Sequence, residues 1–256
     1  MPMLRELTEY HTPATLDEAL KLLRRRKIRT VPIGGGGSLV PDAPRDVQAV
    51  VDLSKLGLSF IEADEDGLSL GATTTLQTLL DDQRVKAYAG GVLLKALRDT
   101  AGRNVRESAT LAGSIVAARG NSPLVTALLA LNAQITTHAQ REQTAPLAEW
   151  IPSNGALITR LSLPALPAEA RAAYEKVART PADLPIVCVA AVQIGAVVRL
   201  ALGGVAERPI VMRLMDITPD QAAQHVQQAI YPATDYFASA AYRREMAGVL
   251  VKRALS

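Results

Sequence analysis

Cysteine is nearly absent from this chain, and its absence removes several kinds of chemistry. A single cysteine, Cys188, among 256 residues excludes an internal disulfide, a CxxC redox pair and an iron–sulfur cluster held by four thiolates of this chain. The three histidines, His11, His138 and His225, are scattered and argue against a histidine-rich metal site. Cys188 lies in the apolar run 185–192, so we expect a buried thiol rather than a reactive one. Redox chemistry in this protein would therefore require an organic cofactor.

Long apolar runs and a marked excess of one charge are missing as well. The longest apolar stretches fall short of the roughly 20 residues that cross a bilayer, so no transmembrane segment is predicted. Residues 1–12 carry charges and lack the apolar centre of a secretory signal, which favours a cytoplasmic protein. The 28 Lys and Arg residues nearly balance the 25 Asp and Glu residues, so nucleic acid is not the expected partner.

Short helices and strands alternate irregularly along the chain, which predicts an α+β fold rather than a doubly wound sheet. Thr15 and Glu18 have the spacing of a capping box and predict a helix over about 15–26. The basic residues at 24–29 are interpreted either as a solvated face or as a docking patch for an acidic partner. The proline-rich stretch 163–168 marks the predicted domain boundary. We predict strands at 30–33, 47–53, 58–62, 68–74, 110–116, 133–138, 186–194 and 197–203, and further helices at 75–81, 90–100, 123–131 and 236–254.

Four consecutive glycines and a serine, residues 34–38, follow the strand predicted at 30–33. Ordering glycine costs more backbone entropy than ordering any other residue, so an ordered glycine loop requires a reason. Backbone N–H groups without neighbouring Cβ atoms can approach a ligand closely and bind an anion such as a pyrophosphate. The loop lacks the Lys-Ser/Thr pair of a P-loop, and Pro41, Asp42 and Pro44 argue against the helix that follows a GxGxxG motif. A phosphate site and a glycine-rich surface turn are both open at this point.

A second loop of small residues, 109–115, precedes the apolar helix predicted at 123–131. It offers two hydroxyl groups and backbone donors that a ligand could use. The alternative is that these small residues only allow a tight crossing from strand to helix. The sequence shows no catalytic triad, no metal-ligand cluster and no paired carboxylates. Two such loops in one half of the chain therefore suggest a cleft that holds a dinucleotide.

Both loops belong to a series of motifs that runs through nearly the whole chain. The motifs are Tyr10–Ala19, Gly34–Leu39, Leu70–Thr74, Arg103–Arg106 with Ala109–Thr110, Tyr174–Lys176 with Arg179 and Asp183, Ala201–Ala206 with Pro209, and Ala238–Met246. In content and order the series resembles the FAD-binding, or medium, subunits of the molybdenum hydroxylases, the family of xanthine dehydrogenase and aerobic carbon monoxide dehydrogenase. This resemblance is more specific than either loop alone.

The resemblance implies a fold, a function and partners. The fold is a two-lobed FAD-binding domain of the vanillyl-alcohol-oxidase type at 1–163, with lobes at about 1–54 and 55–163. A C-terminal α+β domain of the carbon monoxide dehydrogenase flavoprotein type follows at 168–256. The implied function is that of an oxidoreductase subunit, which passes electrons from iron–sulfur clusters on a partner chain to an external acceptor. The implied partners are an iron–sulfur subunit and a molybdopterin-binding large subunit, and NAD, a quinone and oxygen are all open as the acceptor.

FAD is the cofactor that the resemblance implies, and it also implies where FAD is held. The first loop is expected to wrap the pyrophosphate, the second to contact the ribityl and pyrophosphate region, and a lysine to supply a cation near the flavin ring. No side chain of this chain is expected to be catalytic, because the flavin performs the redox chemistry. The residues assigned in this way are Ile33, Gly34, Gly35, Gly36, Gly37, Ser38, Leu39, Thr110, Gly113, Ser114, Ile115 and Lys176. For Lys176 an ordinary surface lysine is the alternative.

The sequence departs from the family pattern in the second loop. Where the family has Thr-Ile-Gly-Gly-Asn, this sequence has Ala112 in place of the first glycine and Ser114 in place of the asparagine. Farther along, Pro123 stands where the family has an aspartate, and Asn121 or Ser122 is the candidate to take over the role of that aspartate. An alanine at a phosphate contact is tolerated only with a negative φ, so weaker flavin binding is expected. The alternatives are therefore a structural or assembly subunit that has lost FAD and a stand-alone flavin oxidoreductase.

Overall fold

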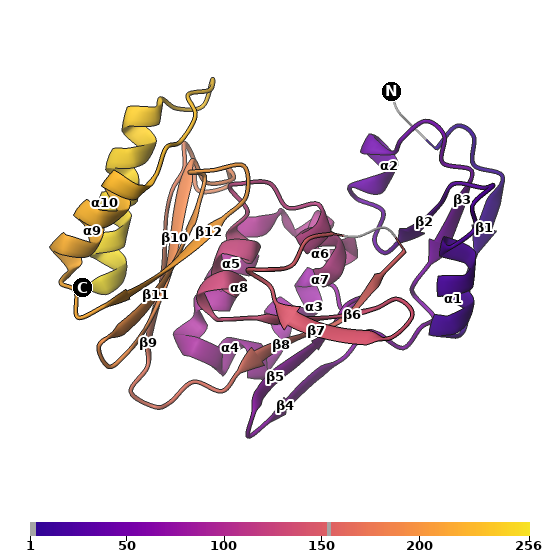
Figure 1. Cartoon of the computed structure of the whole chain (residues 1–256), viewed down its shortest axis with the longest axis horizontal. Coiled ribbons are helices and arrows are strands. Elements are labelled where there is room, and N and C mark those ends of the chain that lie inside the picture. The colour runs from indigo at the N-terminus through magenta and orange to yellow at the C-terminus, as the bar shows by residue number, and fades with distance from the viewer. Residues whose placement is uncertain (1–3, 153–154) are drawn as a thin grey trace.

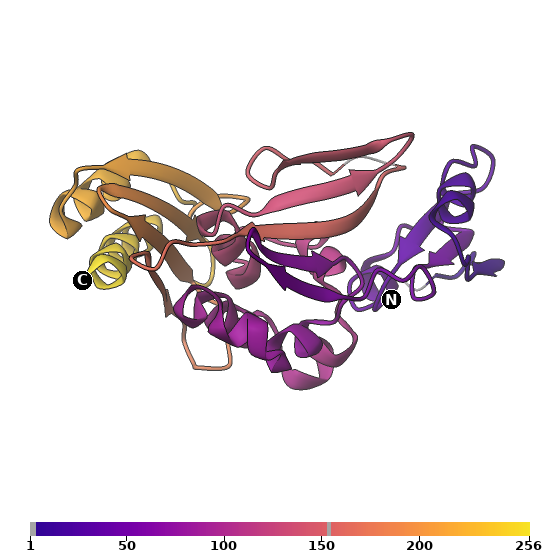
Figure 2. The same cartoon turned by 90° about the horizontal axis from the view of Figure 1, so that it is seen from below.

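The computed structural model describes residues 4–152 and 155–256. The chain forms three lobes in a row, and its first and last described segments lie at opposite ends of that row (Figure 1). A view turned by 90° shows the same order of a small N-terminal lobe, a middle lobe and a C-terminal lobe (Figure 2). Helices and strands are present in every lobe, which confirms the predicted α+β class.

The first lobe is a small parallel sheet with one longer helix packed on it. Its elements are β1 (Glu9–His11), α1 (Leu16–Leu23), β2 (Thr30–Ile33), α2 (Leu39–Asp42) and β3 (Ala49–Asp52). The strands lie in the order β1-β3-β2. Thr15 caps α1, since its side chain accepts a hydrogen bond from the Glu18 N–H at 3.3 Å. The buried core of this lobe is small and consists of Ala19, Leu20, Val51 and Leu53 with Leu157 of the second lobe.

The second lobe packs helices on one side of an antiparallel sheet (Figure 2). Its elements are β4 (Ile61–Asp64), β5 (Gly67–Gly71), α3 (Leu76–Asp81), α4 (Gln83–Ala87), η1 (Tyr88–Gly91), α5 (Val92–Thr100), α6 (Arg103–Ser108), α7 (Leu111–Val116), α8 (Pro123–Ala130), β6 (Gln134–His138), β7 (Glu142–Pro146) and β8 (Leu157–Pro164). The strand order is β4-β5-β8-β6-β7. Helix α8 is buried along its whole length, because it lies between this lobe and the next.

The third lobe is an antiparallel sheet buried on both faces. Its elements are β9 (Arg171–Val177), β10 (Val187–Ile194), β11 (Val197–Gly203), β12 (Ile210–Met215), α9 (Pro219–Ala229) and α10 (Ala240–Leu255). The strand order is β12-β11-β10-β9, and α9 and α10 cover one face (Figure 1). Side chains of β10 alternate between the two faces: Val187 and Val189 pack toward α9 and α10, whereas Cys188 and Ala190 join the core of the second lobe. Burial on both faces explains the continuous apolar run in this strand.

Two local predictions are wrong. Residues 110–116 were expected to form a strand, but Thr110 caps a helix by accepting a hydrogen bond from the Gly113 N–H at 3.2 Å, and α7 follows. Pro41, Asp42 and Pro44 argue against a helix after the glycine loop, yet α2 forms a single turn there. Pro41 lies in that first turn, where its missing N–H has no partner to lose, and Pro44 restricts the residue before it and ends the helix.

Candidate functional site

A cavity of about 1350 Å³ lies between the first and second lobes. It is larger than the roughly 300–1,000 Å³ of an ordinary small-molecule site. Its walls come from residues 25–39 of the first lobe, from several segments of the second lobe, and from Leu184 of the third. The predicted binding residues that line it are Ile33, Gly34, Gly35, Gly36, Gly37, Ser38, Leu39, Thr110, Gly113 and Ser114. Residues from the two separate loops are therefore brought together around one cavity.

The glycine loop needs its glycines for three different reasons. A Cβ atom on Gly35 would lie 1.7 Å from the carbonyl oxygen of Ser108, so this glycine lets the first lobe pack against the second. Gly36 has a φ of 72°, in the left-handed region that favours glycine. Gly37 has neither constraint: a Cβ atom there would meet nothing within 4 Å, and the residue lines the cavity. Packing thus explains the glycine at position 35, and backbone conformation explains the glycine at position 36. Neither explains the glycine at position 37, where a bound ligand is the remaining reason.

Several backbone donors of this loop find no partner among the residues that the structure describes. Within residues 4–152 and 155–256, the N–H groups of Gly35, Gly36, Gly37 and Ser38 donate no hydrogen bond. The Gly36 carbonyl, in contrast, accepts from the Val40 N–H at 3.0 Å as α2 begins. A run of free N–H groups on a cavity wall attracts an anion, because each carries a partial positive charge. The loop therefore has the donor set that a phosphate group requires.

The second loop contributes differently, because it is the start of α7. The N–H of Leu111 donates to the Thr74 carbonyl at 2.9 Å, and the N–H of Ala112 donates to the Ala72 carbonyl at 3.0 Å. The N–H of Gly113 is bonded to the Thr110 hydroxyl oxygen. These backbone donors are therefore used inside the protein, and Ala112 lies within a helix, where φ is negative. Ala112 thus has the negative φ that an alanine at this position requires, and weaker flavin binding is no longer expected from it.

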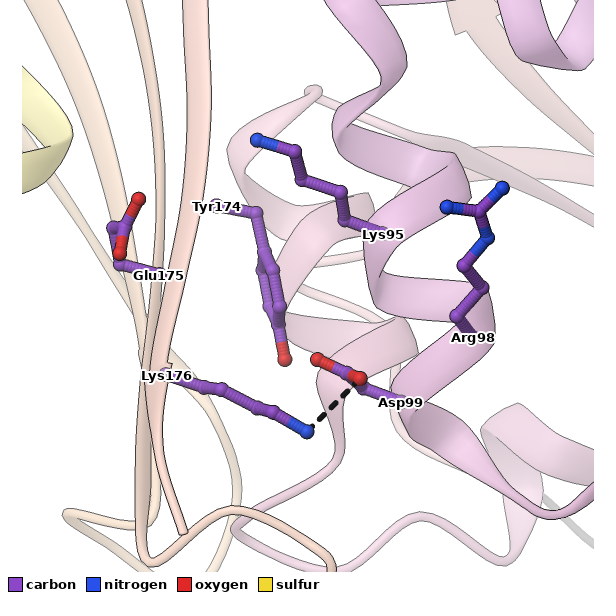
Figure 3. A pocket seen from close by; sticks show the side chains of 6 residues that line it. All are labelled: Lys95, Arg98, Asp99, Tyr174, Glu175 and Lys176. Atoms are coloured by element: carbon purple, nitrogen blue, oxygen red, sulfur yellow. Dashed lines mark ion pairs between the residues drawn. The ribbon is translucent and has the colours of Figure 1, made fainter. Parts of the chain in front are cut away.

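Two predicted site residues do not line this cavity. Ile115 is 2% exposed and belongs to the core of the second lobe. Lys176 lies in a small separate pocket, where its Nζ is 2.9 Å from Asp99 Oδ1 and donates to the Pro181 carbonyl. Figure 3 shows Lys176 projecting from β9 toward α5, which carries Asp99. Lys176 is thus neither beside the cavity nor free on the surface: it joins the second lobe to the third through an ion pair.

The basic stretch after α1 lies at one end of the cavity. Residues 25–29 line it. Arg25 Nη1 lies 2.6 Å from Glu9 Oε2, and Arg29 Nη1 lies 2.6 Å from Asp46 Oδ2. Arg26, Lys27 and Arg29 are exposed, as expected for a solvated face, and a docking patch for an acidic partner stays a prediction. No local signal in the sequence reveals this position, because it depends on how the first lobe faces the second.

Sequence reasoning did not select Trp150 and Leu184 of the wall, and it considered Asn121 only as a substitute for the family aspartate. Trp150 lines the cavity and packs partly on the core of the second lobe. Asn121 lines it near the third lobe and donates from Nδ2 to the Pro185 carbonyl at 3.0 Å. Leu184 brings the third lobe to the same wall. Asn121 had a signal, since it lies beside the position of the missing family aspartate, and Trp150 had one as the single tryptophan of the chain.

Titratable groups away from the cavity behave as structural groups. Burial raises the pKa of the Cys188 thiol to about 11, and burial also raises the pKa of Tyr174. Both groups therefore stay neutral at ordinary pH, which confirms that Cys188 is a buried thiol. In the described part of the chain, no cluster of three His, Cys, Asp or Glu side chains could hold a metal ion. None of the helices described there is long and apolar enough to span a bilayer.

The residues present fit an extended dinucleotide. The volume exceeds that of a typical small-ligand site, free N–H donors occupy one wall, and Gly37 leaves open space where a side chain would otherwise stand. Apolar surface is supplied by Trp150 and Ile158, against which a flat ring can pack. The cavity therefore combines a wall of free N–H groups with apolar surfaces.

Comparisons with known proteins show the family to which this chain belongs. Residues 5–166 match the family described as the FAD binding domain in molybdopterin dehydrogenase, and residues 172–256 match the carbon monoxide dehydrogenase flavoprotein C-terminal domain. The chain is 30% identical over 253 residues to the uncharacterized protein YgfM of Escherichia coli, covering 96% of this chain and 94% of the relative. It is 28% identical over 272 residues to the glyceraldehyde dehydrogenase medium chain of Sulfolobus acidocaldarius, covering 96% of each chain.

A solved structure has the same fold. A chain of the carbon monoxide dehydrogenase from Hydrogenophaga pseudoflava superimposes with a TM-score of 0.87 at 24% identity, covering 97% of this chain and 96% of that chain. The two family matches lead to one assignment, and the cavity with its free N–H groups fits it. The chain belongs to the family of FAD-binding subunits of molybdopterin dehydrogenases, it is an oxidoreductase subunit, and its cofactor is FAD.

Proposed function

We propose that FAD lies extended across the cavity, with its pyrophosphate on the N–H groups of residues 35–38. The observation that carries this proposal is the run of donors that find no partner in the described protein yet line a cavity of dinucleotide size. Thr110 and Ser114 provide hydroxyl groups on the facing wall. Each of these residues binds or orients the cofactor, and none acts as an acid or base.

The redox chemistry is supplied by the isoalloxazine ring of FAD when it is bound. The chain itself holds the ring system in place and limits the access of water. Trp150 and Leu184 supply apolar wall, and Asn121 supplies an amide group near the third lobe. In this arrangement the chain relays electrons and leaves the primary substrate to another subunit.

The composition of the chain supports the proposal of an electron source outside it. The single thiol is completely buried, so the chain cannot hold an iron–sulfur cluster of its own. We propose that electrons arrive from such clusters on a partner subunit, beyond which lies a molybdopterin-binding large subunit. They then leave to an external acceptor, for which NAD, a quinone and oxygen are the candidates. The Sulfolobus relative is likewise named as one chain, the medium chain, of a dehydrogenase.

Competition between cofactor fragments tests the extended pose. We expect the purified chain, freed of flavin, to bind FAD more tightly than FMN, and ADP to compete with FAD, because both the pyrophosphate and the adenosine contribute contacts. Equal affinity for FAD and FMN, with no competition by ADP, would contradict the pose. Fluorescence of Trp150 provides the signal, since this single indole lies on the cavity wall.

Electron transfer is tested with the partner chains. Co-expression with an iron–sulfur chain and a molybdopterin chain from the same source should give a stable hetero-oligomer in which the flavin is reduced by the substrate of the complex. Turnover of a small organic substrate by the isolated chain would favour the stand-alone oxidoreductase instead. The flavin-free structural subunit was inferred in part from Ala112, and the helical position of that residue weakens the inference.

A further inference from the structure

A buried guanidinium of the C-terminal helix is linked to the wall of the cavity. Arg243 of α10 is 6% exposed. Its Nη1 donates to the carbonyls of Ile186 at 2.7 Å and Gly204 at 2.9 Å, and its Nη2 bonds both carboxylate oxygens of Asp235 at 2.8 and 2.7 Å. A buried charge is tolerated because both terminal nitrogens of the guanidinium have partners and the carboxylate balances the charge. Arg243 thus ties three segments of the third lobe to one helix.

Two of these segments continue to the cavity. The Gly204 N–H donates to the Gly120 carbonyl at 2.7 Å, and the Pro185 carbonyl accepts from Asn121 Nδ2 at 3.0 Å. Asn121 lines the cavity, and so does Leu184, which is two residues before Ile186. Arg243 itself does not line the cavity. It is connected to the cavity wall through the segments at 185–186 and 204, which are hydrogen-bonded to Gly120 and Asn121.

Close backbone packing leaves these segments little freedom to move independently. A Cβ atom on Gly204, whose φ is 84°, would lie 2.0 Å from the Ile186 carbonyl oxygen. A Cβ atom on Gly120 would lie 2.0 Å from the Ala206 carbonyl oxygen. A displacement of the segment held by Arg243 is therefore passed to the turn that carries Asn121.

The amide of Asn121 gives this link a chemical consequence. With Nδ2 donating to the Pro185 carbonyl, Oδ1 is the atom left to accept a hydrogen bond. The cofactor offers O–H groups on its ribityl chain and an N–H group on its ring as donors. The orientation of this acceptor depends on the position of Pro185, which Arg243 helps to fix through the adjacent Ile186.

We propose that Arg243 is a positioning residue for FAD: by holding the segment at 185–186, it orients the Asn121 amide toward the cofactor. The proposal rests on the proposed function, because it places FAD in this cavity. It also gives a role to the motif at 238–246, which the phosphate-binding loops do not explain. Lysine cannot replace Arg243 fully, since one ammonium group lacks the planar fork that reaches two carbonyls and a carboxylate together.

A double-mutant cycle on flavin affinity tests the proposal. The variants of the full chain are Arg243→Lys, Asn121→Ala and the combination of the two, and the measured quantity is the Kd for FAD. Asn121→Ala should weaken binding by about threefold to tenfold, the value of one hydrogen bond. Arg243→Lys should weaken binding in the parent chain but not in the Asn121→Ala background. Multiplied losses in the double variant, or no effect of Arg243→Lys on affinity, would overturn the proposal.

Controls separate positioning from general stability. Arg244→Lys changes the next residue of the same helix, whose Nε donates to the Ile230 carbonyl rather than to Ile186 or Gly204, and it should leave FAD affinity unchanged. If Arg243→Lys fails to fold, Asp235→Asn replaces it in the cycle. Asp235 is partly exposed, and the substitution removes its negative charge and one of the two oxygens that accept from Arg243, while Arg243 keeps its bonds to the two carbonyls. The same outcomes then decide the proposal.

Failure of this proposal differs from failure of the site itself. If Asn121→Ala leaves affinity unchanged while an alanine at Gly37 weakens it, the positioning role is wrong and the cavity assignment stands. If neither change affects FAD binding, the cavity assignment is wrong, and the positioning role is wrong with it.

Discussion

Replacement of Gly37 by alanine separates the cofactor's need for an open backbone from the fold's need for glycine. The φ of Gly37 lies outside the left-handed region, and a Cβ atom there meets nothing within 4 Å. The added methyl group therefore enters only the cavity. Gly35 is the matched control, because its Cβ atom would lie 1.7 Å from the Ser108 carbonyl oxygen and disturb the contact between the lobes.

The expected effect on FAD binding is large for a single methyl group. A hydrogen bond to a charged group contributes about 1.5–3 kcal/mol, and moving one phosphate oxygen away from one N–H donor would therefore lower affinity by about 10-fold to 150-fold. The flavin-free protein should instead gain about 0.4–1 kcal/mol of stability, since alanine reduces the freedom of the unfolded chain. That gain corresponds to a rise in Tm of roughly 1–4 °C. Titration with FAD and thermal unfolding of the flavin-free protein measure the two effects.

The control should show the opposite effect on the stability of the flavin-free protein. Gly35→Ala is expected to lower the Tm of the flavin-free protein, because overpacking against backbone costs about 1–3 kcal/mol. An unchanged Kd for FAD in the stable Gly37→Ala variant would refute the reasoning, since it would mean that no phosphate approaches this part of the loop.

Three further predictions follow from the same geometry. Removal of FAD should increase amide hydrogen exchange more in residues 9–52 than in β9–β12, because the first lobe has a small core and faces the cavity; equal increases would contradict this. Ala112→Gly should leave the Kd for FAD unchanged and lower stability by roughly 0.5–1 kcal/mol, as expected for glycine inside a helix. Cys188 has its pKa raised to about 11, against roughly 8.5 in an unfolded chain, so its contribution to stability is complete below pH ~8.5 and is lost as pH rises toward 11. Denaturant titrations across that range should show a smaller fall for Cys188→Ala than for the parent chain.

Features that depend on neighbouring residues could be predicted from the sequence. Thr15 caps its helix through an N–H three residues away, and the glycine loop at 34–38 follows its strand as expected. The apolar run around Cys188 predicted a buried thiol, because a strand covered on both faces requires apolar side chains at every position. Family motifs then extended these local signals to FAD and to the fold.

Only the tertiary structure decided which distant groups meet. Lys176 pairs with Asp99 because the third lobe packs β9 against α5, and no local pattern encodes that contact. The helix at Leu111–Val116 depends on a cap that competes with the strand preference of β-branched residues. Arg243 is connected to the cavity through carbonyls of segments far from it in the chain. Local hydrogen bonds and hydrophobic periodicity can therefore be predicted from neighbouring residues in the sequence. Ion pairs and cavity walls between lobes depend instead on how the helices and strands pack once they have formed.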